Sequence, residues 1–145
     1  MIYRKYIYII FVAIGIIGCK TRINQMVNHQ RECRWKTTDT LDFVYISKGK
    51  YSKGKEIGTW KYFYNGKLVR KEKYHYAICN MTFYHPNGKI MKQGKSKTES
   101  NSETSHWYYY GKWHFYNTKG KLDSIKEYQQ EIATDSLDIN ILENN

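Results

Sequence analysis

Apolar and polar residues alternate along most of this chain in short runs and not at helical spacing. From Leu41 onward, each run of aromatic and β-branched residues ends at a glycine beside a polar residue. Four segments have the composition of a strand, a turn and a second strand, at residues 41–51, 58–76, 81–95 and 106–128. The pattern predicts an all-β fold, an antiparallel sheet of repeated β-hairpins.

The expected turns have recognisable chemistry. Asn65-Gly66 suits a two-residue hairpin turn, because both residues tolerate a positive φ. Pro86-Asn87-Gly88 places proline where φ near −65° is needed and glycine where the strand resumes, and Lys119-Gly120 is a looser version. An earlier Gly54-Lys55 marks either a turn at the opposite end of the sheet or a degraded first hairpin.

Two stretches of the chain are nearly the same, GTWKYFYNGKL at 58–68 and GKWHFYNTKGKL at 111–122. The turn glycines Gly66, Gly88 and Gly120 are separated by 22 and 32 residues. Removing the hydrophilic stretch 96–105 makes the second interval equal to the first. This predicts repeat units with a polar loop, 96–105, inserted between two of them.

The repeated motif resembles the MORN-variant repeats of bacteria, over about residues 51–128. Two units carry its pattern, one at Gly58, Trp60, Phe63, Gly66 and Lys67, the other at Gly111, Trp113, Tyr116, Gly120 and Lys121. A middle unit keeps Tyr84, Gly88 and Lys89 but has Met81 in place of tryptophan. The resemblance implies a single-layer or solenoid-like stack of hairpins. That family has many small secreted or lipoprotein members, often labelled antitoxin-like.

The N-terminus has the pattern of a secretory signal. Arg4 and Lys5 precede an apolar run, Ile7–Gly18, that is shorter than the roughly 20 residues needed to span a bilayer. Its end, Ile16-Ile17-Gly18-Cys19, resembles the lipobox of bacterial lipoproteins. That resemblance implies cleavage between Gly18 and Cys19, a diacylglycerol on Cys19, and a location on a membrane of the bacterial cell envelope. The alternative is an ordinary signal or an uncleaved anchor.

The expected organisation has four parts. They are a signal peptide at 1–18, a lipidated N-terminus and tether at 19–40, the hairpin domain at 41–128, and an acidic tail at 129–145. In an oxidising compartment Cys33 and Cys79 form a candidate disulfide, with two unpaired thiols as the alternative.

Aromatic residues are the candidates for a binding surface, because tyrosine and tryptophan offer large rigid contacts with a polar group. Trp60, Tyr62 and Tyr64 are expected on one face of their strand, with Lys61 and Phe63 on the other. The proposed contact residues are Trp60, Tyr62, Tyr64, Trp107, Tyr109, Trp113 and Phe115. The alternative is that these rings are the core of a thin sheet.

The chain is basic, with a formal net charge of +11, although residues 129–145 hold four acids and no base. An envelope location argues against nucleic acid, and favours an anionic lipid or glycan, or an acidic protein partner. Solubility and protection of sheet edges would also explain the lysines. The five histidines, His29, His75, His85, His106 and His114, stand in no catalytic or zinc-binding spacing. We therefore expect no catalysis, no cofactor and no metal.

Together these features predict a membrane-anchored envelope lipoprotein that recognises another protein, with an antitoxin-like or immunity-like role implied by the resemblance. The alternative is a lipoprotein that binds envelope lipid or glycan, or that is structural.

Overall fold

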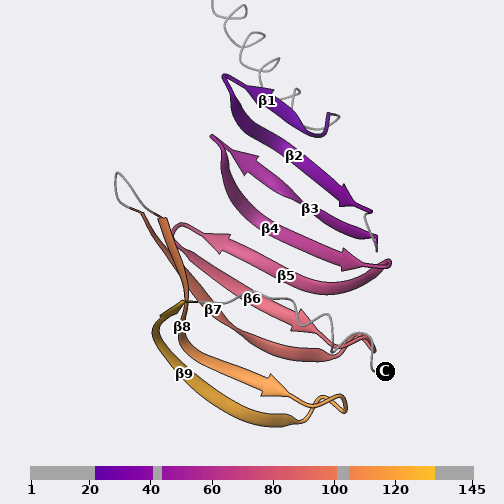
Figure 1. Ribbon diagram of the computed structural model, residues 1–145, viewed down its shortest axis with the longest axis vertical. Coiled ribbons are helices and arrows are strands. Elements are labelled where there is room, and N and C mark those ends of the chain that lie inside the picture. Colours follow the sequence, from indigo (N-terminus) through magenta and orange to yellow (C-terminus); the bar gives the residue numbers. More distant parts are fainter. Residues whose placement is uncertain (1–21, 41–43, 101–104, 133–145) are drawn as a thin grey trace, which may run out of the picture.

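The computed structural model describes residues 22–40, 44–100 and 105–132. This part of the chain forms one sheet in which each strand pairs only with its neighbours in sequence, always antiparallel (Figure 1). The strands are β1 (Gln25–Val27), β2 (Gln30–Asp39), β3 (Tyr45–Ser52), β4 (Lys55–Tyr64), β5 (Lys67–His75), β6 (Ile78–Tyr84), β7 (Ile90–Ser100), β8 (Ser105–Tyr116) and β9 (Leu122–Ile132). The predicted antiparallel all-β sheet of hairpins is confirmed.

The turns lie where the sequence predicts them. Asn65 and Gly66 connect β4 to β5 with φ angles of 45° and 80°, the positive values that a tight hairpin turn requires. Gly88 N donates to His85 O at 2.8 Å, and Gly120 N donates to Asn117 O at 2.8 Å, closing the β6–β7 and β8–β9 turns. Lys53-Gly54 connects β3 to β4, so the early glycine marks a turn at the opposite end of the sheet.

The sheet is larger than the predicted hairpin domain at both ends. The expected tether, 19–40, is wrong for residues 25–27 and 30–39, which form β1 and β2. The expected tail, 129–145, begins inside β9, which continues to Ile132. Strand formation here depends on backbone pairing with a neighbouring strand, which a polar sequence also permits. The signal segment 1–18, Cys19 and residues 133–145 lie outside the described residues.

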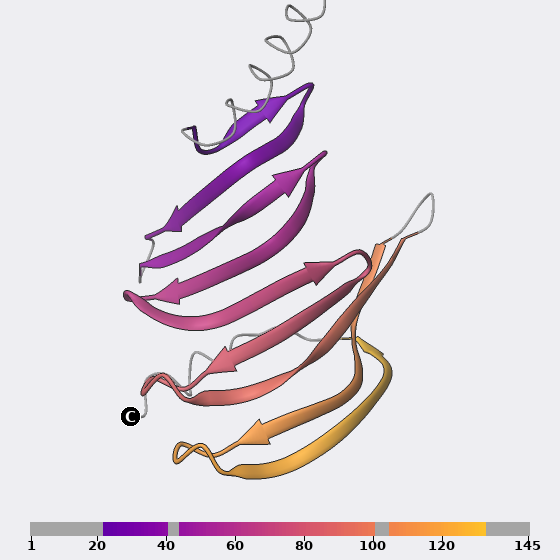
Figure 2. The same ribbon diagram turned by 180° about the vertical axis from the view of Figure 1, so that it is seen from behind.

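The polar insert lengthens a hairpin. The prediction of a loop over 96–105 is wrong for residues 96–100 and 105, since Thr98 pairs with Trp107 and Ser100 with Ser105. Seen from behind in Figure 2, the β7–β8 hairpin extends past the turn that joins β5 to β6. The insert therefore adds length to two strands, and the register of the neighbouring units is kept.

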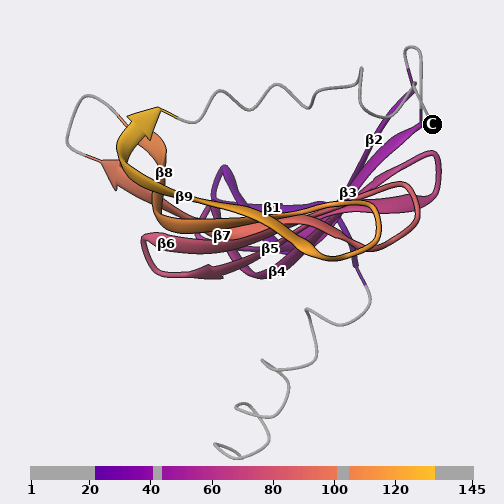
Figure 3. The same ribbon diagram turned by 90° about the horizontal axis from the view of Figure 1, so that it is seen from below.

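The sheet is one twisted layer, seen edge-on in Figure 3, and its two faces differ. We call one the aromatic face, defined by Trp60, Tyr62, Phe83, Tyr109 and Trp113. We call the other the lysine face, defined by Lys36, Lys48, Lys61, Lys71 and Lys95. The strand registers place each set on one side, because successive residues of a strand point to opposite faces.

The repeated Gly-x-Trp motif has a structural role. Trp113 of β8 is 0% exposed and lies on Gly94 of β7, while Trp60 of β4 is 3% exposed and lies on Gly49 of β3. Each indole donates to the carbonyl after that glycine, Trp113 Nε1 to Lys95 O at 2.9 Å and Trp60 Nε1 to Lys50 O at 3.1 Å. The first glycine of each motif, Gly111 or Gly58, has a positive φ where the register shifts.

Because a single-layer sheet has no second layer to cover it, each tryptophan must be buried by its own neighbours. The bare glycine backbone lets the indole lie flat on the adjacent strand. Tyr109, Phe83 and Tyr128 then enclose Trp113, with ring centroids 4.1, 6.1 and 6.2 Å away. The core of this protein is therefore one face of its sheet.

Candidate binding faces

A buried carboxylate lies at the centre of the aromatic face. Glu72 of β5 is 5% exposed and lies between Trp60 of β4 and Met81 of β6. Its Oε2 accepts from the hydroxyls of Tyr62 at 2.7 Å and Tyr74 at 2.9 Å, and its Oε1 is 3.4 Å from Arg70 Nε. These partners satisfy a charge that would otherwise be costly to bury. The carboxylate is therefore part of a structural network.

The same network disfavours ionisation of the groups around it. Burial, and then the charge of Glu72, raise the pKa of Tyr62 and of Tyr74 far above 10. Burial, and then the same charge, raise the pKa of Cys79 from 9.0 to about 12. A thiol held protonated in this way is a poor nucleophile, since the thiolate is the reactive form.

These shifts predict alkaline destabilisation. Cys79, Tyr62 and Tyr74 ionise at lower pH in the unfolded chain than in the folded one, so the folded state holds more protons. The stability they contribute is complete below the unfolded pKa values, near 9 and 10. It is lost as pH rises toward the folded values. Denaturant melts from pH 7 to pH 11 should show the fall, and Cys79→Ala should delay its start from about pH 9 to about pH 10. A flat profile across that range would contradict the buried network.

Cations and rings alternate across the aromatic face. Arg70 Cζ lies 4.0 Å from the ring centre of Tyr62 and 5.9 Å from that of Phe83. Lys92 Nζ lies 4.4 Å from the centre of Phe83 and 5.6 Å from that of Tyr109. Each such contact contributes about 0.5–1 kcal/mol at an exposed site, and more when it is desolvated. Tyr62, Arg70, Phe83 and Lys92 are paired residues on the neighbouring strands β4 to β7, and Lys92 is paired with Phe115 on β8.

The structure separates the predicted contact residues into two groups. Trp60, Tyr109 and Trp113 are buried, so placing them on a binding surface was wrong; they form the core. They were mistaken for surface residues because a single-layer sheet gives no sign in sequence of which rings its neighbours cover. Tyr62, Tyr64, Trp107 and Phe115 are half-buried on the same face and keep part of each ring accessible.

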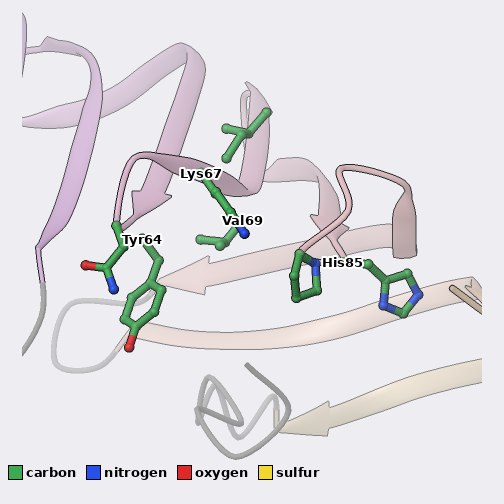
Figure 4. A pocket seen from close by; sticks show the side chains of 7 residues that line it. Tyr64, Lys67, Val69 and His85 are labelled. Carbon is green, nitrogen blue, oxygen red and sulfur yellow. The ribbon is translucent and has the colours of Figure 1, made fainter. Parts of the chain in front are cut away.

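A small hollow lies at the end of the sheet between two turns (Figure 4). It has a volume of about 160 Å³ and is lined by Tyr64, Asn65, Lys67, Leu68, Val69, His85 and Pro86. His85 is held in place, because its Nε2 lies 2.9 Å from Tyr116 O. Sites for small ligands are usually about 300–1,000 Å³. The hollow is too small for a cofactor, although it could accept one side chain of a partner beside Tyr64.

The lysine face carries a row that sequence reasoning missed. Lys36, Lys48, Lys61 and Lys71 lie directly opposite one another on β2, β3, β4 and β5. Their sequence spacing is irregular, so the row becomes visible only once the strand register is known. Like charges placed directly opposite each other across a sheet are destabilising.

Removing one charge from this row should therefore stabilise the protein. We expect Lys61→Gln to raise the free energy of unfolding by about 0.5 kcal/mol at low salt, because Lys61 lies between two other lysines. The matched control is Lys112→Gln, which removes a lysine opposite Glu127 and should slightly destabilise. Urea melts in 10 mM and 500 mM NaCl would test this, since salt should reduce both effects. Equal effects of the two variants would contradict the register-based explanation.

The predicted Cys33–Cys79 disulfide is wrong. Cys79 is a free, buried thiol in β6, and Cys33 is disulfide-bonded in β2, with three strands between them. Strands in a sheet lie about 4.8 Å apart, so side chains four strands apart cannot bond. Within residues 22–40, 44–100 and 105–132 there is no group of three or more side chains able to hold a metal ion. The same residues include no helix long and apolar enough to cross a membrane.

Comparison with known protein families, with curated proteins and with solved structures gives no match to this chain. The resemblance to MORN-variant repeats therefore stays a prediction.

Proposed function

We propose that this protein is a membrane-anchored, non-catalytic recognition module that binds another protein through the aromatic face. The observation that carries the proposal is the set of half-buried rings, Tyr62, Trp107 and Phe115, that stays accessible beside Arg70 and Lys92. Aromatic and arginine side chains are enriched at the energetic centres of protein interfaces. The buried core beside them on the same face holds these rings rigid before binding, which lowers the entropic cost of association.

The chemistry of the face favours a partner with an acidic or extended segment. Lys126 of β9 approaches the ring of Phe115, at 5.6 Å from its centre, so a cation also flanks a half-buried ring on the strand next to the sheet edge. Among the described strands β9 pairs only with β8, so an extended segment of a partner could pair with its other edge and reach these rings, as in strand addition. By the family resemblance, a protein with toxic activity at the membrane is one such partner.

Affinity capture with paired variants tests the recognition proposal. The protein is tagged and captured from solubilised native membranes, beside Trp107→Ser and Tyr110→Ser variants. Trp107 is half-buried on the aromatic face, whereas Tyr110 is 45% exposed on the lysine face of the same strand. A stoichiometric protein that is lost with Trp107→Ser and kept with Tyr110→Ser supports the proposal. Capture of lipid or polysaccharide alone would replace it with the envelope-binding alternative.

Intact mass spectrometry tests the anchor. A diacylglycerol thioether on Cys19 would add the mass of the lipid to a chain that begins at Cys19. A sulfur in a thioether cannot also form a disulfide, and the chain has three cysteines, of which Cys79 is free and Cys33 is bonded. A lipidated Cys19 could therefore not be the disulfide partner of Cys33. A monomer without lipid, two hydrogens lighter than its reduced form, would rule out the lipid anchor.

A further inference from the structure

The lysine face carries a row of four lysines that no acidic side chain among the described residues neutralises. No ion pair is formed by Lys36, Lys48, Lys61 or Lys71 within the described residues. Two ion pairs elsewhere among these residues are Arg70–Glu72, on the aromatic face, and Lys97–Glu99, on the lysine face near the end of the long hairpin. Three of the four lysines are exposed and Lys71 is half-buried. Their mutual repulsion is therefore relieved only by anions from outside this part of the chain.

Aliphatic and aromatic side chains are exposed on the same face. Ile57 is 41% exposed opposite Lys50, Tyr110 is 45% exposed opposite Lys95, and Ile125 is 52% exposed opposite His114. They lie on β4, β8 and β9, so they are spread over the width of the sheet. Binding to a bilayer surface is strengthened by apolar side chains that enter the interface and by attraction of basic side chains to anionic lipids, and this face offers both.

We propose that the lysine face is a docking surface for an anionic lipid bilayer, so that the sheet lies flat on the membrane with its aromatic face outward. The inference rests on the proposed function in one respect, the anchor that brings the chain to a membrane. Cys19 is three residues before Arg22, the first described residue, and an extended residue spans at most about 3.6 Å. The edge of the sheet at β1 is therefore held within about one headgroup layer of the bilayer.

Two other occupants fit less well. A second copy packed face to face would place lysines against lysines, which is repulsive at close range. A soluble polyanion would pair with the lysines but would leave Ile57 and Ile125 in water. A bilayer surface satisfies both groups, because phosphate headgroups pair with the lysines and the interfacial region accepts the apolar side chains.

Two adjacent residues of β9 provide a matched test. Ile125 points to the lysine face, Ser124 points to the aromatic face, and both are exposed. The full chain, as the cell processes it, is made as Ile125→Cys or Ser124→Cys. The introduced cysteine carries a nitroxide label, while Cys79 is buried and therefore protected from the labelling reagent. Power saturation with oxygen and with a water-soluble nickel chelate then reports contact with lipid or with water. The vesicles hold phosphatidylcholine and phosphatidylglycerol at three to one.

The proposal predicts a several-fold lower accessibility to the nickel chelate at 125 than at 124. Because β9 is the strand farthest from β1, contact there requires the sheet to lie flat. The contrast should disappear with pure phosphatidylcholine, and with the triple variant Lys48→Gln, Lys61→Gln, Lys71→Gln. It should also weaken when NaCl rises from about 0.1 M to about 1 M, since the Debye length falls from about 10 Å to about 3 Å.

Several results would overturn it. Equal accessibility of the two labels in the anionic vesicles would mean that the sheet stands away from the bilayer. Dipolar broadening between labels at 125 would mean that a second copy covers the face. A contrast that persists in phosphatidylcholine would remove the role of the lysines. If mass spectrometry finds no lipid, the anchor fails, yet the same chain mixed with vesicles still tests the face through co-sedimentation.

Discussion

Replacing Gly94 by alanine is expected to lower the free energy of unfolding by about 3 kcal/mol, the upper range for an overpacked core. A Cβ on Gly94 would lie 2.3 Å from Cδ2 of Trp113, a contact that neither the backbone of β7 nor the enclosed indole can accommodate in place. Either the indole ring leaves its site or strands β7 and β8 separate, and both outcomes break the hydrogen bond from Trp113 Nε1 to Lys95 O. Urea unfolding followed by tryptophan fluorescence measures the loss.

A control for this substitution is Gly111→Ala, two residues before the tryptophan. A Cβ there would meet nothing within 4 Å, so only the positive φ of 67° opposes it, which should cost about 1 kcal/mol. A double variant Gly94→Ala with Trp113→Leu should be less destabilised than the sum of its single changes, because the smaller side chain makes room for the methyl group. Strict additivity would show that the glycine serves some purpose other than accepting the indole.

Trp113→Ala is expected to destabilise the protein still further, with a loss of about 4 kcal/mol in the free energy of unfolding. The side chain is fully buried, and it contacts rings on β6, β8 and β9, so its removal leaves a cavity shared by several strands. Trp107→Ala removes a ring of the same size six residues earlier on the same face. Because Trp107 is half-buried, we expect a loss of about 1–2 kcal/mol.

Chemical denaturation with circular dichroism at 25 °C would compare the two variants. Near-equal losses would mean that the aromatic face is evenly exposed and has no distinct core at Trp113. In that case the buried tryptophan could not be the reason for the repeat, and the repeated motif would need another explanation.

Local patterns in the sequence were sufficient to predict the hairpins but not their partners. The turn at Asn65-Gly66 could be predicted from these two residues alone, because only their own φ angles have to be positive. Trp60 and Trp113 were visible as a repeat, yet their role depends on Gly49 and Gly94, which belong to the preceding strand. Each of those glycines precedes a lysine and lies within a strand, where glycine is uncommon. A glycine inside a strand, with no turn to account for it, was therefore the signal in the sequence that a tryptophan lies on that position.

The failures have a common physical cause. Strands β1 and β2 contain few apolar residues, so composition predicted a tether, whereas backbone pairing with β3 is what makes β2 a strand. The row of lysines and the separation of Cys33 from Cys79 both depend on strand order and register. Those quantities arise from pairing between segments, and no single segment determines them.

Because strand order follows chain order, each strand can complete its pairing as soon as the next one is made. No strand waits for a distant segment, so the sequence separation between contacting residues is small, which favours rapid folding. If the protein is exported, as its proposed function requires, the chain leaves its channel N-terminus first. This topology would let the sheet assemble hairpin by hairpin during translocation, with β1 and β2 present to receive β3 before Trp113 has emerged. A half-emerged chain would then expose the outer edge of β1 and the strand formed last, with no unpaired strand between them.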